Sequence, residues 1–600
     1  MSIVAFKILV CDLANWPAEP LAVVANGFGK VANSRNKQDP DYLALVAIAN
    51  VILGCDLASW VPQHLALAIN GLVKVADSHN EQDPIYQALT AIATVVIEGD
   101  LTNWPAQPLA MLADALGKVA ERQNEQNPAY QALMAIAKVI TPSLLRTHQK
   151  DWTAQHLAMM VNGLGKVADR QNEQCPAYQA LMAIAEVITP EALAINQRDW
   201  TAQHLTMVTN GLGKVVDRQN KQCPIHQVLI AIAKVIKPDL IRTNQKNWTG
   251  QNLAMVANGL SKIADSQNKQ DPAYQAMMFI AELITLRALK TNKKDWAAQH
   301  LGMVTNVMSR VTDNQNEQGP FYPALISIAN FVLECDLASW SAKPLAMVAN
   351  GLGKVIKSQN EQDPAYRALI AMAIVILGCD LARWPEQELA MTTNGLSKVV
   401  NTQDEQDPAY RALIAMAMVI LRCDLTNWTA QDLSMVTNGL SKIADSQNQQ
   451  SPACQALTYI AKVILKCDLA SWPSQPLAMV ANGLSKIADS QIKQSPAHRA
   501  LTYIAKVILR RDLASWPAQP LAMVANGLGK VANSWNKKAP AYQALIAIAT
   551  VILERDLTSL LIQPQALFMN GLGKVADSQN EQICNALSAM QAIKCVKDFL

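Results

Sequence analysis

Asparagine and a basic residue recur four positions apart along the whole chain, and this pair is the most regular polar feature of the sequence. The asparagine stands ten residues after a regularly spaced tryptophan, and the basic residue runs from Lys30 to Lys574, with Arg310 as the one arginine. An amide both donates and accepts hydrogen bonds, and a cation attracts anions. The series reads Asn26, Asn70, Asp114, Asn162, Asn210, Asn258, Asn306, Asn350, Asn394, Asn438, Asn482, Asn526 and Asn570.

Two interpretations of this Asn/Lys ladder are open. In the first, which we favour, the amides hydrogen-bond from one repeat to the next and fix the stacking, while the lysines are solvated and partly neutralised by acids such as Asp489 after Lys486. In the second, amides and lysines line one groove that grips phosphates or an extended peptide backbone. The residue after the asparagine is glycine in eleven of thirteen units. Glycine inside a helix costs about 1 kcal/mol relative to alanine, so we expect close backbone approach there.

A second set of basic residues gathers in four long connectors in the middle of the chain. We call this set the basic ridge and interpret it as a partner-binding surface, with solvated loops as the alternative. Ten basic residues stand against five acids, Asp151, Glu191, Asp199, Asp239 and Asp295, which leaves a net charge of +5. The basic ridge consists of Arg146, Lys150, Arg198, Lys237, Arg242, Lys246, Arg287, Lys290, Lys293 and Lys294.

Residues that could serve a metal site or an active site do not form a constellation. His64, His156, His204 and His300 each follow a tryptophan by four residues, but other units carry Pro, Asn, Asp or Glu there, so we interpret them as variable surface residues. Six cysteines recur once per unit in a Cys-Asp-Leu connector, too far apart for a disulfide or a shared metal, and are expected to be small buried hydrophobes. No hydrolase, metalloprotease or phosphate-loop motif occurs. We expect no enzyme activity, no cofactor and no metal.

These positions belong to a repeat of 44 residues, lengthened to 48 in four units. Twelve tryptophans mark its phase, Leu560 stands at the thirteenth mark, and Trp535 lies outside the series. We divide the single array into a partial first repeat (1–15), repeats of 44 residues (16–140), repeats with lengthened basic connectors (141–295), repeats of 44 residues (296–559) and a C-terminal capping repeat (560–600). The phase-marking tryptophans are Trp16, Trp60, Trp104, Trp152, Trp200, Trp248, Trp296, Trp340, Trp384, Trp428, Trp472 and Trp516.

Each unit contains two helical patterns. The first begins near the tryptophan, which Ser, Asn or Asp usually precedes as a predicted N-cap. The second begins at a proline that follows Asp, Asn or Ser, as at Asp39-Pro40, and is apolar nearly all round, so we expect it to be the inner helix of the stack. Prolines in the lengthened connectors predict a third, short helix there. The fold is therefore predicted to be an all-α solenoid of HEAT or armadillo type with about thirteen repeats.

Composition and charge narrow the function classes. Half of the residues are hydrophobic and 16% are charged, which supplies a continuous core and argues against disorder. A net charge of +3 gives little reason to expect nucleic acid or a membrane surface as partner. The near-identical units also lack the side-chain variation that reading RNA base by base requires. Apolar stretches are too short to cross a bilayer, and we identify no signal peptide.

The strings LAMVANGLSK at 253–262 and 477–486 and LAMVANGLGK at 521–530 resemble the repeat core of the SKWP-repeat type III effectors of plant-pathogenic bacteria. The resemblance covers the first helix of nearly every unit, but the Trp-Pro pair stands here at the helix start instead of after Ser-Lys. A weaker resemblance links the same strings to octotricopeptide repeats, which bind organellar RNA. The effector resemblance implies a large α-solenoid that acts on host proteins and has no established active site.

Two functions follow as hypotheses. The first is a non-enzymatic scaffold for protein–protein interaction, an effector made in the bacterial cytoplasm and secreted into a host cell. The alternative is a nonspecific RNA-binding solenoid that uses the Asn/Lys ladder and the basic ridge. Met1 aligns within a second helix, which is expected of a fragment of a longer protein or of a wrongly chosen start.

Overall fold

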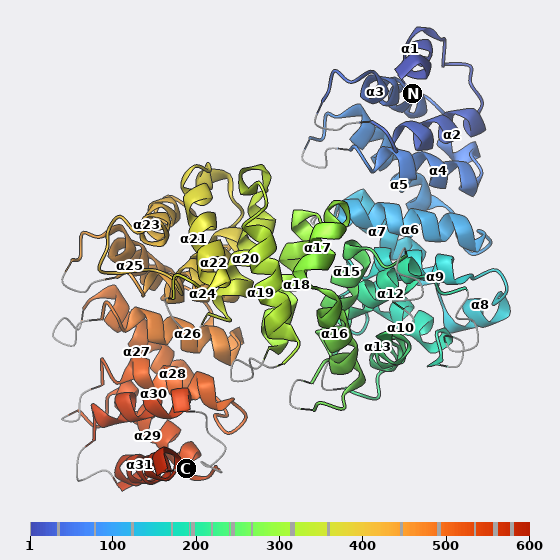
Figure 1. Ribbon diagram of the computed structural model, residues 1–600. Coiled ribbons are helices and arrows are strands. Elements are labelled where there is room, and N and C mark those ends of the chain that lie inside the picture. The colour runs from blue at the N-terminus through green and yellow to red at the C-terminus, as the bar shows by residue number, and fades with distance from the viewer. Residues whose placement is uncertain are drawn as a thin grey trace.

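The fold is described from a computed structural model of the chain. The description covers residues 2–599 apart from short segments, which are 33–35, 77–79, 122–124, 170–171, 191–192, 194–198, 218–219, 239–240, 242–246, 266–267, 313–318, 357–359, 445–447, 489–493, 533–535, 556–561 and 577–580. Throughout these residues the chain is helical and contains no strand. Helical pairs stack from the N-terminus to the C-terminus in a winding array (Figure 1). The predicted all-α solenoid is confirmed.

The first helix of each repeat packs against the first helices of the units before and after it. These first helices are α2 (Ala18–Phe28), α4 (Pro62–Leu72), α6 (Ala106–Ala120), α9 (Ala154–Leu164), α12 (Ala202–Val215), α15 (Gly250–Leu260), α18 (Ala298–Val311), α20 (Ala342–Gly353), α22 (Glu386–Leu396), α24 (Ala430–Leu440), α26 (Ser474–Leu484), α28 (Ala518–Leu528) and α30 (Ile562–Gly573).

The second helices form a parallel layer of their own. They are α1 (Ser2–Val10), α3 (Pro40–Leu53), α5 (Pro84–Glu98), α7 (Pro128–Val139), α10 (Pro176–Val187), α13 (Pro224–Val235), α16 (Pro272–Leu283), α19 (Phe321–Val332), α21 (Pro364–Leu377), α23 (Pro408–Ile420), α25 (Pro452–Ile464), α27 (Pro496–Ile508), α29 (Pro540–Leu553) and α31 (Glu581–Phe599).

The second helices begin as the sequence predicts, whereas the first helices have a different N-cap from the predicted one. Second helices begin at the predicted proline, and the Asp83 carboxylate caps α5 by accepting a hydrogen bond from the Ile85 amide at 3.1 Å. First helices begin about two residues after the tryptophan, but the polar residue before the tryptophan is not their cap. That residue ends a 3-10 turn, as in η1 (Leu57–Ser59) and η6 (Leu469–Ser471). The cap follows the tryptophan instead, as at Thr153.

The first helices, and not the second, form the inner layer of the stack. Their backbones nearly touch, because a Cβ atom added to Gly71 would lie 2.3 Å from the carbonyl oxygen of Ala25. Second helices approach less closely: a hollow opens among α7, α10 and α13, and Ile374 and Met418 are about half exposed. A layer with shorter spacing lies inside the curve of a superhelix. The expectation that the second helix is inner was wrong. The inner layer is the one whose helices approach most closely, and small residues at the contact allow that approach, whereas an apolar surface on all sides of a helix does not.

Short extra helices occupy two of the lengthened connectors, one at the predicted proline Pro142 and one in the connector that has no proline. They are α8 (Pro142–Thr147) and α17 (Leu286–Thr291), the latter followed by the 3-10 turn η3 (Lys293–Asp295). The helix α8 packs against α10, and α17 packs against α19, so both lie on the side of the second helices. The other two long connectors lie mostly outside the described residues.

None of the described helices combines the length and the apolar character needed to span a bilayer.

The close approach of the first helices predicts opposite effects for the same substitution at two repeats. Gly395→Ala places a Cβ atom 2.4 Å from the carbonyl oxygen of Ala349 and should destabilise the fold by about 1–3 kcal/mol, through forced separation of α20 and α22. Gly27 occupies the equivalent position of α2, where a Cβ atom meets nothing within 4 Å, so Gly27→Ala should be neutral or mildly stabilising. Thermal and urea unfolding of both variants measures the difference, and equal destabilisation would refute the close contact.

Candidate binding groove

Seven neighbouring pairs of ladder residues are hydrogen-bonded from one first helix to the next. The Asn70 amide nitrogen donates to the Asn26 side-chain oxygen at 2.9 Å, across 44 residues of sequence. The same bond recurs from Asn162 to Asp114 (2.7 Å), Asn350 to Asn306 (3.1 Å), Asn394 to Asn350 (3.0 Å), Asn438 to Asn394 (2.9 Å), Asn526 to Asn482 (2.7 Å) and Asn570 to Asn526 (2.5 Å). Asn210 and Asn258 are half-buried at the equivalent positions.

The basic residue of each unit shares a face with the ladder. It stands four residues beyond the asparagine, one helical turn further on, and the one acidic ladder position shows the contact directly. There the Lys118 ammonium donates to the Asp114 carboxylate at 2.7 Å. The amide ladder and the basic row therefore run side by side along the inner layer, and we call this surface the groove.

In the N-terminal half of the groove, one carboxylate contacts two members of the basic row. Glu121, at the end of α6, lies 2.6 Å from the Lys214 ammonium and 3.7 Å from that of Lys166. Burial raises the pKa of Glu121, but Lys214, Lys166 and Lys343 outweigh this effect and lower the pKa below its ordinary value. Lys343, which adds to this lowering of the Glu121 pKa, belongs to α20.

In the C-terminal half, no such carboxylate occurs among the described residues; Asp313, Asp445 and Asp577, three residues beyond Arg310, Lys442 and Lys574, lie outside them. Within the described part of the chain, no carboxylate lies within ion-pairing distance of seven of these residues, which we call the unpaired row: Arg310, Lys354, Lys398, Lys442, Lys486, Lys530 and Lys574. The sequence also places no acid three residues beyond Lys354, Lys398 or Lys530, where Lys357, Asn401 and Asn533 stand. Asp489, expected to neutralise Lys486, lies outside the described residues.

Burial and mutual repulsion weaken the protonation of the unpaired row. Burial, with help from Arg310, lowers the pKa of Lys354 to about 8. Burial and the neighbouring Lys442 lower the pKa of Lys398, although the Lys398 side chain is exposed. Burial and Lys486 do the same for Lys442. Exposed ammonium groups with lowered pKa values are expected where protein surrounds a concave surface and limits its hydration.

The basic ridge lies elsewhere, with the second helices. Arg146 of α8 contacts Glu186 of α10 at 3.2 Å, and Lys290 of α17 contacts Glu334 at 2.6 Å, so the structure pairs two members with acids of the next repeat. Lys150, Lys237, Arg287, Lys293 and Lys294 are exposed. Arg198, Arg242 and Lys246, together with the acids Glu191 and Asp239, lie outside the described residues.

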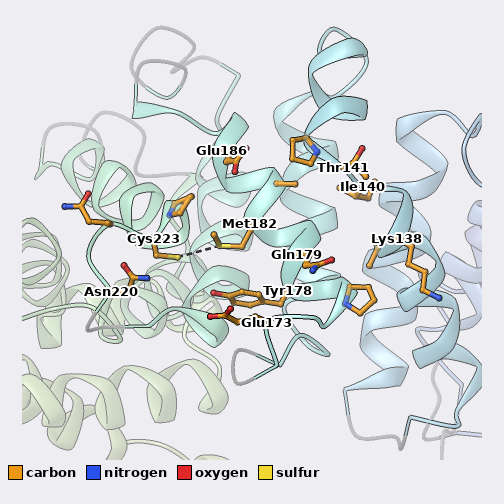
Figure 2. Close-up of a pocket in the computed structure, with 16 residues that line it drawn as sticks. Lys138, Ile140, Thr141, Glu173, Tyr178, Gln179, Met182, Glu186, Asn220 and Cys223 are labelled. Atoms are coloured by element: carbon orange, nitrogen blue, oxygen red, sulfur yellow. Dashed lines mark hydrogen bonds between the residues drawn. The ribbon is translucent and has the colours of Figure 1, made fainter.

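A pocket that the sequence did not predict lies between second helices. It has a volume of about 730 Å³ and lies among α7, α10 and α13. Tyr178, Met182 and Cys223 lie in this hollow in Figure 2, with the Cys223 sulfur 3.6 Å from the Met182 sulfur. A similar hollow of about 580 Å³ recurs one repeat earlier around Tyr130 and Met134. Its origin is the wide spacing of the second helices, which periodicity alone does not reveal.

The histidines and cysteines have local structural contacts. The ring nitrogen Nδ1 of His156 lies 2.9 Å from the Asp151 carbonyl oxygen, and His204 and His300 are placed in the same way. The Cys55 thiol contacts the Val51 carbonyl oxygen at 3.3 Å, and burial raises its pKa. The connector cysteines are mostly half-buried, not fully buried as expected. No cluster of three metal-ligating residues occurs in the described part of the chain.

No protein-family model and no curated protein match this chain. A solved structure of Kap121p bound to Ste12p is similar at a TM-score of 0.29 and 12% identity, over 96% of this chain and 56% of that one. The chain thus spans a little over half the length of that Kap121p chain. A structure of SYS-1 is similar at a TM-score of 0.29 and 11% identity, over 96% of this chain and 99% of that one. The likeness is one of helical-repeat fold and identifies no binding residue.

The ladder should contribute to stability most where it is buried. Asn394 donates to Asn350 and accepts from Asn438, so Asn394→Ala breaks two bonds and leaves the buried Asn350 side-chain oxygen without this donor. We expect a loss of about 1–3 kcal/mol in the free energy of unfolding. Asn570→Ala removes one bond at an exposed position and should cost less than about 1 kcal/mol. Urea unfolding compares the variants, and an equal loss at both positions would contradict the buried ladder.

The lowered pKa of Lys354 predicts a pH dependence of stability. Its pKa is about 8 in the folded chain and 10.5 ordinarily, so the unfolded chain binds more protons between these values. Stability should therefore rise with pH from about 8 to 10.5 as the folded chain loses an unfavourable charge. Lys354→Met should flatten this rise. Urea midpoints measured across this pH range test the effect, and an unchanged slope in the variant would contradict it.

Proposed function

We propose that this chain is a non-enzymatic scaffold that binds an extended acidic protein segment along the groove. The observation that carries the proposal is the unpaired row, a run of cations along the first helices that lower one another's pKa and have no carboxylate partner among the described residues. Unpaired like charges at this proximity are unfavourable for the free protein, and an anionic ligand relieves that repulsion. The fold supports the role, because a solenoid presents a long continuous surface to an extended partner.

An extended polypeptide fits this surface better than a nucleic acid does. Proteins that bind single strands without sequence preference combine a basic groove with aromatic rings on which bases stack. Here the tryptophans mark the helix starts, and Trp428, Trp472 and Trp516 are buried at 6–8% exposure. The tyrosines stand mainly on the second helices, away from the groove.

Nucleic acid remains the second candidate, since the unpaired row also suits a phosphate backbone. Neutralising phosphates releases counterions, so that affinity should fall steeply with salt. A weak dependence on salt between about 50 and 200 mM would count against this candidate.

A scaffold role also follows from the uniformity of the array. Catalysis requires a few side chains held in one unique arrangement, whereas equivalent positions here differ little from unit to unit. Many equivalent positions instead allow a long partner to bind through several weak contacts at once.

The effector role and export into a host cell are part of this proposal, and they rest on the resemblance of the LAMVANGLSK strings alone. A translocation reporter fused to the chain tests them. Delivery into plant cells that depends on a functional type III secretion system supports the role, and a signal that persists without that system contradicts it.

Charge substitution in the groove tests the proposed binding. Lys398→Gln with Lys442→Gln should weaken binding of a fluorescent polyglutamate peptide about threefold to tenfold in an anisotropy titration, because two charge contacts are lost. The matched control replaces Lys462 and Lys506, exposed lysines of the second helices α25 and α27, and should leave affinity unchanged. Equal effects of the two pairs would refute the groove, and tighter binding of a single-stranded RNA of equal charge would favour nucleic acid.

A further inference from the structure

A pair of sulfur atoms lies in the hollow among α7, α10 and α13. Met182 of α10 and Cys223, the residue before α13, line this hollow of about 730 Å³ next to each other (Figure 2). The Cys223 thiol donates to the Met182 thioether, with 3.6 Å between the two sulfur atoms. Cys223 is 6% exposed and Met182 is half-buried, so an ion reaches the pair through the hollow.

Cys223 departs from the repeat pattern in a way that helix packing does not require. It is the N-cap residue of α13, where the equivalent Asp83 and Asn127 accept a hydrogen bond from a backbone amide of their helix. The Cys223 side chain makes no such bond, and α13 therefore lacks the stabilisation that a capping side chain contributes. Its thiol contacts Met182 instead. Departures of this kind from local preference are expected where a residue serves a function.

The methionine and the cysteine also occur together in the sequence. The sixth residue after the proline that starts a second helix is methionine in three units, at Met134, Met182 and Met278. In two of these units a cysteine, Cys175 or Cys223, stands 41 residues further on, at the N-cap of the next second helix. Met278 has no cysteine at that position and offers a matched control.

Two sulfur atoms at this distance can bind one metal ion together. Metal–sulfur bonds are about 2.3 Å long, so a single ion can contact both sulfur atoms at their observed separation of 3.6 Å. Thiolate and thioether are soft ligands, which select soft ions such as Cu(I). Zinc instead prefers a complete tetrahedral set, and the described part of the chain holds no group of three His, Cys, Asp or Glu side chains that could bind a metal.

Tyr178, which also lines the hollow, is placed to support a thiolate. Burial and the neighbouring Cys223 raise the pKa of the Tyr178 phenol, so the phenol stays protonated near neutral pH. A protonated phenol next to Cys223 can donate a hydrogen bond to the sulfur. Such a bond from behind a metal ligand orients the ligand and adjusts its affinity for the metal.

We propose that Met182 and Cys223 form a binding site for a single Cu(I) ion between the second helices α10 and α13. On binding, the Cys223 thiol releases its proton to solvent, and the ion forms one bond to the thiolate and one to the thioether. The ion keeps its charge of +1, so the step consumes no oxidant or reductant. The site is separate from the groove and departs from the sequence-based expectation that the chain holds no metal.

Competition with the Cu(I) chelator bicinchoninate, under ascorbate and without oxygen, measures the site. The full chain should withdraw about one equivalent of Cu(I) more than Cys223→Ser does. Serine should preserve the fold, because Ser495 caps α27 at the equivalent position by accepting a hydrogen bond from the His498 amide. The control Cys379→Ser replaces a half-buried thiol that donates to the Val375 carbonyl oxygen, and it should keep the full equivalent. Retention of this equivalent by Cys223→Ser, or the same loss in Cys379→Ser, would overturn the site.

The thioether is tested by a substitution of similar size. Met182→Leu should weaken Cu(I) binding about tenfold or more, since even residues behind a metal ligand contribute that much to affinity. Met278→Leu changes the equivalent, half-buried methionine of α16 and should leave Cu(I) affinity unchanged. Equal affinities in these two variants would show that Met182 is not a ligand, and tighter binding of Zn(II) than of Cu(I) by the unsubstituted chain would contradict the soft-ion site.

Discussion

The close approach of successive first helices is the constraint on which the rest of this structure depends. Small residues at the contact, such as Gly395 against Ala349, let two helix backbones meet without intervening side chains. Contact at this distance excludes water from the polar groups nearby, so every asparagine at the junction needs a partner from the protein. From Asn306 to Asn438, each ladder asparagine finds that partner in the asparagine of the adjacent repeat. Stacking and polar satisfaction therefore depend on the same positions.

The same constraint produces the electrostatics of the groove. Helices that stack in register place equivalent side chains at a fixed short interval, so one lysine per repeat becomes a row of cations. Lys166 and Lys214 share the Glu121 carboxylate, whereas Lys354 and Lys398 have no carboxylate partner among the described residues, and burial together with a neighbouring cation lowers the pKa of each. The packing of the first helices thus also produces a charged surface, on which one cation recurs in each repeat.

Sequence periodicity was sufficient to predict the helices, their number per repeat and the Asp-Pro starts of the second helices, because each depends on local chemistry. It failed on which layer is inner, because curvature follows from the relative spacing of two layers and thus from contacts between repeats. It also failed to identify the unpaired row, since the lysines look alike in every unit. Only the structure shows that Lys214 has a carboxylate while Lys398 has none within the described residues. Asp114, the one ladder position without an amide, pairs with Lys118 of the same helix.

The groove and the basic ridge differ in how strongly water and salt screen their charges. The basic ridge has the greater local density of basic residues in the sequence, but its described members are exposed or paired with acids such as Glu186 and Glu334. Exposed charges are screened by salt within about 10 Å and contribute little to affinity. The cations of the groove are fewer, yet burial lowers the pKa of Lys354, Lys398 and Lys442, so the surrounding protein limits the hydration of these three ammonium groups. A partner gains more from neutralising Lys354 and its neighbours than from contacting the basic ridge, because only in the groove does binding remove a repulsion that the fold itself imposes.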